Sequence, residues 1–141
     1  MKNLIIYLFF VSFVTLYAQD KKGNCNFVYQ VSVENSINDE IKSIYDSKIQ
    51  WNFSKLDLKN ISCTIEIVPI KDCMNELNAT KFKTSFVISS SDAGFSPKGS
   101  KVLNYLEFMA KCYKWRVIIT DTIKSCSETS EWKYISFLSK N

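Results

Sequence analysis

The sequence predicts an all-β domain, built as a seven-stranded antiparallel β-sandwich. The first observation is an alternation at period two through residues 113–121, which is typical of a strand with one buried face. The residues that it sends to the apolar face are Tyr113, Trp115, Val117 and Ile119. The second observation is that similar short stretches recur along the chain, separated by polar or glycine- and proline-containing segments. The third is that convincing helical periodicity is scarce.

Seven stretches carry the strand pattern. They are residues 26–34, 48–56, 61–70, 82–90, 100–111, 113–121 and 132–139. In the first stretch one face is apolar (Phe27, Tyr29, Val31 and Val33) and the other is mostly polar (Val28, Gln30, Ser32 and Glu34). In the second, Ile49, Trp51 and Phe53 share the inward phase. Pro69 marks the end of the third because proline cannot donate a ladder hydrogen bond. Residues 37–44 fit a short helical turn or a connecting loop.

Residues 100–111 fit two different structures. The positions in phase for a strand are Val102, Leu106 and Phe108, interrupted by Asn104. The positions in phase for a helix are Val102, Leu103, Leu106 and Ala110, after a Ser100 cap. The strand completes the seven-stranded sandwich. The helix at 100–111 is the alternative, and it would give an α+β fold.

The N-terminal residues have the layout of a secretory signal peptide. Lys2 supplies one positive charge, residues 4–16 are almost wholly apolar, and Ala18 is a small residue where the peptidase reads the chain. The apolar run is shorter than the roughly 20 residues of a membrane span; an uncleaved anchor is the alternative. We therefore predict a signal peptide at residues 1–18, a single β-sandwich domain at residues 19–141, and a secreted or periplasmic location.

The composition limits the chemistry available to the chain. It has no histidine, which excludes Ser-His-Asp and Cys-His catalysis and any zinc site with imidazole ligands. Its net charge of +4 is too small and too evenly scattered to indicate nucleic acid or an anionic membrane as a partner. The carboxylates considered as acid–base pairs are Asp39, Glu40 and Asp46, or Asp121 with Glu128. Scattered surface carboxylates explain them better, so we predict no catalytic residue, no cofactor and no metal ligand.

The cysteines point to disulfides. The five of them all follow the signal peptide: Cys25, Cys63, Cys73, Cys112 and Cys126. In an oxidising compartment such residues form disulfides far more often than metal sites, and the sequence contains no C-x-x-C spacing. Because the number is odd, one thiol stays unpaired or joins a second chain in a dimer. The residues alone do not select the pairing.

Three parts of the sequence together resemble a known family. They are Trp51 in the second strand, residues 62–70 as the third strand, and Tyr113-Lys-Trp-Arg-Val117 in the sixth. With seven strands in this order, the chain resembles a fibronectin type III domain, or a related immunoglobulin-like domain, of an exported bacterial protein. The resemblance implies a tyrosine corner, in which the Tyr113 hydroxyl bonds back to the preceding turn. The chain departs from the family at Glu107, where a leucine is usual.

The resemblance also implies a disulfide framework. Antiparallel third and sixth strands place Cys73 beside Cys112, which implies a Cys73–Cys112 bridge. The other cysteines lie at the opposite pole, where one further pairing is implied among Cys25, Cys63 and Cys126; Cys63 and Cys126 are the predicted members. The alternative is local pairing, of Cys63 with Cys73 and of Cys112 with Cys126.

The predicted function is a small secreted binding module, for a protein or glycan at the cell surface or in the envelope. The longest loop, at residues 89–99, and the loop at residues 122–131 are the predicted contact surfaces. Trp132 and Tyr134 are candidates for an aromatic binding platform, although such residues more often belong to the core face of a last strand. The alternative function is a small exported hydrolase or a thiol-redox protein.

Overall fold

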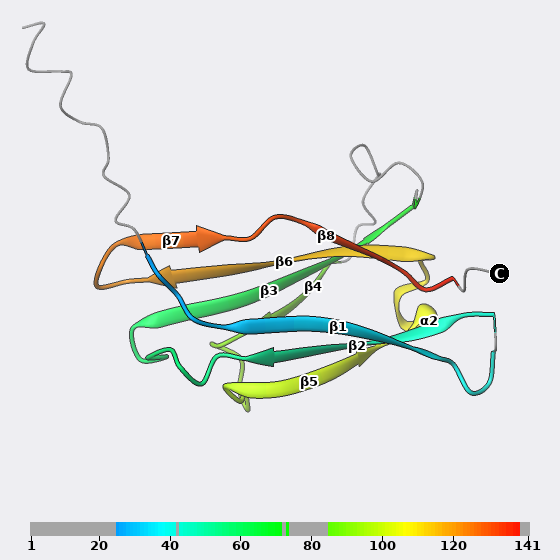
Figure 1. Cartoon of the computed structure of the whole chain (residues 1–141), viewed down its shortest axis with the longest axis horizontal. Coiled ribbons are helices and arrows are strands. Elements are labelled where there is room, and N and C mark those ends of the chain that lie inside the picture. Colours follow the sequence, from blue (N-terminus) through cyan, green and yellow to red (C-terminus); the bar gives the residue numbers. More distant parts are fainter. Residues whose placement is uncertain (1–24, 42, 72, 74–84, 139–141) are drawn as a thin grey trace, which may run out of the picture.

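The computed structural model describes residues 25–41, 43–71, 73 and 85–138, and the fold is an all-β sandwich of two antiparallel sheets, as predicted. One sheet has three strands in the order β1 (Gln30–Ile37), β2 (Tyr45–Asn52) and β5 (Lys98–Leu103). The other has five: β4 (Phe86–Ser89), β3 (Ile61–Ile70), β6 (Cys112–Asp121), β7 (Cys126–Thr129) and β8 (Lys133–Ser136). Figure 1 shows the two layers and the short helix α2 (Tyr105–Phe108) at one end. The predicted signal peptide and residues 82–84 of the fourth predicted strand lie outside the described residues.

The described strands number eight, because the last edge of the larger sheet is split. β7 pairs with the C-terminal half of β6 and β8 with its N-terminal half. Between them, the Ser130 hydroxyl accepts the hydrogen bond of the Val117 N–H at 2.9 Å, and the Ser130 N–H donates to the Val117 carbonyl, also at 2.9 Å. The Ser130 hydroxyl thus takes the place of a backbone carbonyl as the acceptor for the Val117 N–H. The predicted loop at residues 122–131 therefore contains a strand.

The ambiguous stretch at residues 100–111 divides into a strand and a single helical turn. β5 ends at Leu103, and Asn104 then caps α2, with its Oδ1 accepting the N–H of Glu107 at 2.7 Å. Met109 ends the turn in the left-handed region, at φ 51°. Asn104, which interrupts the strand pattern in the sequence, is the residue that starts the helix. The helix of the α+β alternative is thus only four residues long.

The core lies between the sheets and contains the apolar face of β6. Tyr113, Trp115 and Val117 are all at most 3 % exposed. Tyr113 packs on Phe108 and Phe137, with ring centroids 5.6 and 5.1 Å away. These contacts bury one face of the long central strand.

The predicted tyrosine corner is absent from this core. The Tyr113 hydroxyl has no hydrogen-bond partner in the described part of the chain, because the ring points into the apolar interior. Burial raises the pKa of Tyr113 to about 12. The Ser47 hydroxyl lies near enough to offset part of this shift, and it donates its own proton to Asn35 at 2.7 Å.

Two disulfides close the sandwich, one at each pole. Cys73 and Cys112 are joined, with Cα atoms 5.8 Å apart, which is the pairing that the strand order implies. The second bridge joins Cys25 to Cys126, with Cα atoms 6.1 Å apart. Cys63, predicted as a disulfide residue, is instead a free and buried thiol.

The sheet order explains why Cys63 and Cys126 do not pair. Cys63 lies opposite Ile119 of β6, and Cys126 lies opposite Asp121 of the same strand. β6 therefore separates the two cysteines by two strand spacings, about 9–10 Å. A disulfide needs Cα atoms within about 7 Å, so the chain that leads into β1 supplies the partner for Cys126.

Candidate functional site

The outer face of the three-stranded sheet carries polar side chains in cross-strand rows. The strand register places Gln30 opposite Asn52 and Asn52 opposite Lys98. The next row contains Ser32, Gln50 and Ser100. Residues two apart on a strand share a face, and directly paired residues do too. Six polar side chains therefore form a regular patch on one side of the sheet.

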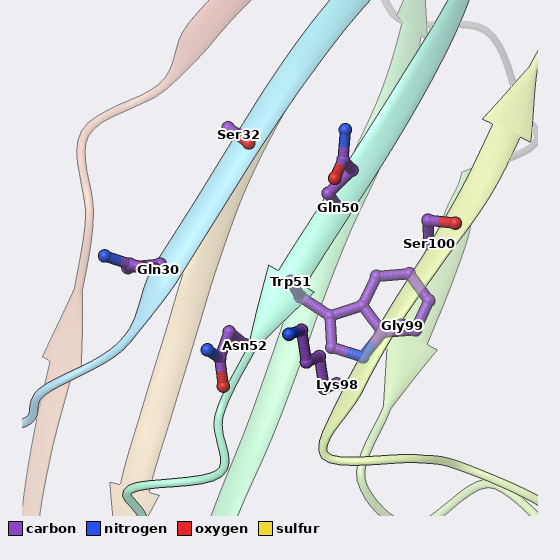
Figure 2. A pocket seen from close by; sticks show the side chains of 8 residues that line it. All are labelled: Gln30, Ser32, Gln50, Trp51, Asn52, Lys98, Gly99 and Ser100. Atoms are coloured by element: carbon purple, nitrogen blue, oxygen red, sulfur yellow. The ribbon is translucent and has the colours of Figure 1, made fainter.

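These rows line a hollow of about 380 Å³ on the sheet surface. Figure 2 shows the side chains that contribute to it from β1, β2 and β5. The residues lining the hollow are Gln30, Ser32, Gln50, Trp51, Asn52, Lys98, Gly99 and Ser100. Trp51 and Gly99 occupy the alternate strand positions, so they belong to the floor rather than to the rows. We refer to this feature as the polar hollow.

The floor depends on a close contact between Trp51 and Gly99. A Cβ atom added at Gly99 would lie 2.6 Å from the Cζ2 atom of Trp51, so any side chain at this position would collide with the indole. The Trp51 Nε1 donates to the carbonyl of Ser96 at 2.9 Å, and its ring stacks on Phe95 with centroids 6.2 Å apart. The indole therefore joins β2, β5 and the segment between β4 and β5 into one rigid unit.

Two of the row side chains are held in place by neighbours. The Gln50 Nε2 donates to the Glu34 carboxylate at 2.9 Å. The Asn52 Oδ1 accepts from the backbone N–H of Ser54 at 3.1 Å and from its hydroxyl at 2.6 Å. These bonds orient both amides and leave the Gln50 carbonyl and the Asn52 Nδ2 without a partner among the described residues.

The remaining row side chains have no internal partner. Within the part of the chain that the structure describes, these side chains make no hydrogen bond or ion pair: Gln30, Ser32, Lys98 and Ser100. All four are exposed. The hollow thus presents donors and acceptors that the fold itself does not use.

Trp132 and Tyr134, the predicted aromatic platform, lie on the outer face of the five-stranded sheet and not in the main core. The Trp132 ring is covered by two cations, with the Lys114 Nζ 4.8 Å and the Arg116 Cζ 4.4 Å from its centroid. Tyr134 has the Lys114 Nζ 6.0 Å from its centroid. Glu66 completes the row through an ion pair in which the Arg116 Nε lies 2.6 Å from its Oε2. We refer to this arrangement as the cation–aromatic ladder.

The two aromatic residues of the ladder also belong to a second, smaller apolar cluster beside the Cys73–Cys112 disulfide. Its members are Val68, Ile70, Cys73, Cys112, Trp132 and Tyr134. Each aromatic ring is therefore already in contact with residues of the same sheet. This arrangement suits the attachment of β8 to the sheet better than it suits a binding platform.

Three of the candidate carboxylates are brought together at the hairpin between β1 and β2. Asp39, Glu40 and Asp46 border a hollow of about 430 Å³. The Asn38 Nδ2 donates to both carboxylate oxygens of Asp46, at 3.1 and 3.0 Å, and its Oδ1 accepts from the backbone N–H groups of Glu40 and Ile41. This network stabilises the turn. No group of three or more potential metal ligands is found among the described residues.

Asp121 and Glu128 each have a separate structural partner. The Asp121 Oδ1 accepts from the backbone N–H groups of Ile123 and Lys124, both at 2.9 Å, which closes the turn between β6 and β7. Glu128 accepts from the Tyr29 hydroxyl at 3.4 Å. Burial raises the pKa of Tyr29, and the Glu128 carboxylate raises it further. These contacts do not assign an acid–base role to either carboxylate.

The predicted contact loop at residues 89–99 is a folded connection between the two sheets. Ser90 holds it to β3, because its hydroxyl accepts the Cys63 N–H at 2.9 Å. Phe95 and Ser96 bind Trp51, as described above, and Gly94 provides a positive φ of 83°. Its last two residues, Lys98 and Gly99, belong to β5. The loop thus supports the polar hollow.

The sequence pattern does not indicate that the residues of the polar hollow form a site. Gln30 and Ser32 are visible there as the polar face of the first stretch. Their alignment with Gln50 and Lys98 depends on the pairing register of three strands that are distant in sequence. The signal that the sequence does carry is a set of neutral polar residues at alternate positions.

Comparisons with known proteins returned no match: no family model fits the chain, and neither a curated protein nor a solved structure is significantly similar to it.

Proposed function

We propose that the protein is a small exported binding module of the fibronectin type III type, with its ligand held at the polar hollow. Two disulfides stabilise the sandwich and close it at both poles. The observation that carries the proposal is the set of six exposed or half-buried polar side chains, of which two are oriented by hydrogen bonds and four have no partner among the described residues. They lie above a floor in which Trp51 packs against Gly99. Binding sites combine a preformed surface with a few placed polar groups.

The sheet order supports the fibronectin type III assignment over an immunoglobulin constant-type sandwich. In the constant type the fourth strand extends the sheet of the first, second and fifth strands. Here β4 pairs with β3 in the other sheet. The core position of Tyr113 and Trp115 on the sixth strand agrees with the sequence resemblance.

Export is supported by the N-terminal sequence and by the disulfides. Disulfides persist in oxidising compartments such as the periplasm and the extracellular space. The described residues include no helix with the length and apolarity of a membrane span. We therefore place the module outside the cytoplasm, where its partner is a protein or glycan of the envelope or the cell surface.

We propose binding rather than catalysis because the candidate carboxylates take part in structural networks. Asp46 is bound by Asn38, and Asp121 caps a turn. No specific contact favours a hydrolase. The buried thiol of Cys63, whose pKa burial raises to about 11, is poorly suited to thiol exchange, because the thiolate is the reactive form.

The test is retention of the chain covering residues 19–141 on immobilised envelope material. The variant Gln50→Ala with Asn52→Ala removes the two oriented amides of the hollow. Its matched control, Ser62→Ala with Thr64→Ala, removes two polar side chains from the outer face of the other sheet. We expect the first variant to lose about ten-fold in affinity and the control to bind like the wild type. Equal retention of both variants would place the site elsewhere.

A further inference from the structure

We infer that the polar hollow takes a neutral oligosaccharide, a ligand whose surface consists mainly of hydroxyl groups. This inference rests on the proposed function and names the class of its ligand. Five of the six row side chains are amides or hydroxyls, which carry both donor and acceptor atoms: Gln30, Ser32, Gln50, Asn52 and Ser100. A sugar hydroxyl also donates and accepts. The groups that the rows leave free include both donors and acceptors, so they are complementary to such a surface.

The charges in the hollow argue against a polyanion. Among the described residues, Lys98 is the only charged one that lines it. Recognition of a polyanion such as nucleic acid depends on several cations placed together. Glu34 and Lys48, paired in the next row, add one charge of each sign to the rim, and Glu34 is already bound by Gln50 at 2.9 Å. A neutral ligand fits this balance of charge.

The absence of apolar side chains in the rows argues against a protein surface as the ligand. Protein interfaces depend on a few aromatic or apolar anchors seated in pockets. Within the described residues, the side chains of both rows are all polar, and the indole of Trp51 belongs to the floor. The nearest exposed apolar residues in phase with the rows are Val28, two residues before Gln30, and Val102, opposite Lys48; neither lines the hollow.

The geometry suits a short stretch of an extended chain. The rows run across three strands about 4.8 Å apart, and they lie two residues apart along each strand, about 7 Å. The volume of about 380 Å³ is near the lower end of the range for small-molecule sites. The patch in Figure 2 therefore offers repeated, evenly spaced polar groups, as a repeating glycan does.

The experiment uses the chain covering residues 19–141, produced in a bacterial periplasm so that the triplet Asn52-Phe-Ser54 carries no N-linked glycan. Binding is measured by calorimetry to neutral oligosaccharides of glucose, mannose, xylose and N-acetylglucosamine, and to two anionic polysaccharides, heparin and polygalacturonate. Circular dichroism of each variant verifies the fold.

We expect at least one neutral glycan to bind, with little change in affinity between about 50 and 200 mM salt. Gln50→Ala with Asn52→Ala should lower that affinity about ten-fold. Ser62→Ala with Thr64→Ala should leave it unchanged, and Lys98→Met should change it much less than the loss of the two amides.

Other outcomes separate the failure of this inference from the failure of the proposed function. Binding to anionic glycans alone, lost with Lys98→Met or in salt, would overturn the neutral class while the hollow remains the site. If Gln50→Ala with Asn52→Ala abolished binding of an envelope protein but changed binding of no glycan, the oligosaccharide class would likewise be overturned and the hollow would remain the site. Glycan binding that survives this variant would overturn both. Failure of every neutral glycan to bind would overturn the inference.

Discussion

The two outer faces of the sandwich use polar residues in different ways. On the five-stranded sheet, Glu66, Arg116 and Trp132 form a row in which each group has its partner within the sheet. On the three-stranded sheet, Ser32 and Ser100 flank Gln50 without bonding to it. Opposite charges and aromatic rings can satisfy one another across strands. Short neutral side chains in adjacent strands leave their hydrogen-bonding groups free, and we propose that an external ligand uses them.

This difference assigns separate roles to the two faces. The cation–aromatic ladder and its apolar cluster hold the split edge strand and the Cys73–Cys112 bridge against β6. The row side chains of the polar hollow contribute little packing to the fold, because most of them are exposed. Substitutions on the first face should therefore change stability, and substitutions on the second should change binding.

The largest expected effect is at the disulfide beside the ladder. Replacing Cys73 and Cys112 together by alanine opens a bridge that spans 39 residues of sequence. We expect a loss of about 4 kcal/mol in the free energy of unfolding, chiefly because the unfolded chain gains freedom. Denaturant titration under non-reducing conditions measures it. A loss below about 1 kcal/mol would show that the five-stranded face does not depend on this bridge.

The next test compares one aromatic residue of the ladder with one amide of the hollow. Trp132→Ala removes a ring that packs on Lys114 and Arg116, and we expect it to lower the free energy of unfolding by about 3 kcal/mol. Gln50→Ala should change the free energy of unfolding by less than about 0.5 kcal/mol, because the Gln50 side chain is half-buried on the sheet surface and not part of the core. Thermal unfolding of both variants measures the difference. Similar losses for the two would contradict the division of roles.

A smaller effect on stability is expected at the floor of the polar hollow, where Gly99 contacts Trp51. Gly99→Ala forces its Cβ against the Trp51 indole and should lower stability by about 2 kcal/mol through overpacking. In a Trp51→Ala background the collision is gone, so the same substitution should cost little. A double-mutant cycle gives the coupling energy. Independent, additive losses would mean that the contact does not define the floor.

The smallest expected effect concerns the core between the two sheets. It is a pH dependence of stability that arises from the buried Cys63. Burial raises the pKa of the Cys63 thiol from 9.0 to about 11. Between these two values the folded chain holds a proton that the unfolded chain releases, so stability falls as the pH rises through this window. The expected loss is about 1.4 kcal/mol at pH 10.

Cys63→Ala provides the control for this pH dependence. The variant should show a flatter stability profile between pH 9 and 11. The contribution of Tyr113, whose pKa is raised to about 12, remains in both proteins and appears at higher pH. Chemical denaturation at a series of pH values measures the profile. An identical slope in both proteins would exclude Cys63 as its source.

The sequence by itself determined the fold class and the inward face of the main strand. The alternation of Tyr113, Trp115 and Val117 depends only on the period of a strand, and burial of one face follows from it. The Cys73–Cys112 bridge followed only from the resemblance to a fibronectin type III domain, whose antiparallel third and sixth strands bring the two cysteines together. These features are local patterns or follow from the order of neighbouring elements.

The tertiary structure decided the remaining features, because each depends on contacts between distant segments. β6 lies between Cys63 and Cys126, so Cys25 became the partner of Cys126 across 101 residues of sequence. The pairing of β2 with β5 placed Gly99 against Trp51 and aligned the rows of the polar hollow. A period-two pattern predicts which residues share a face of a strand. The register, which only the folded chain defines, states which residues of other strands lie beside them.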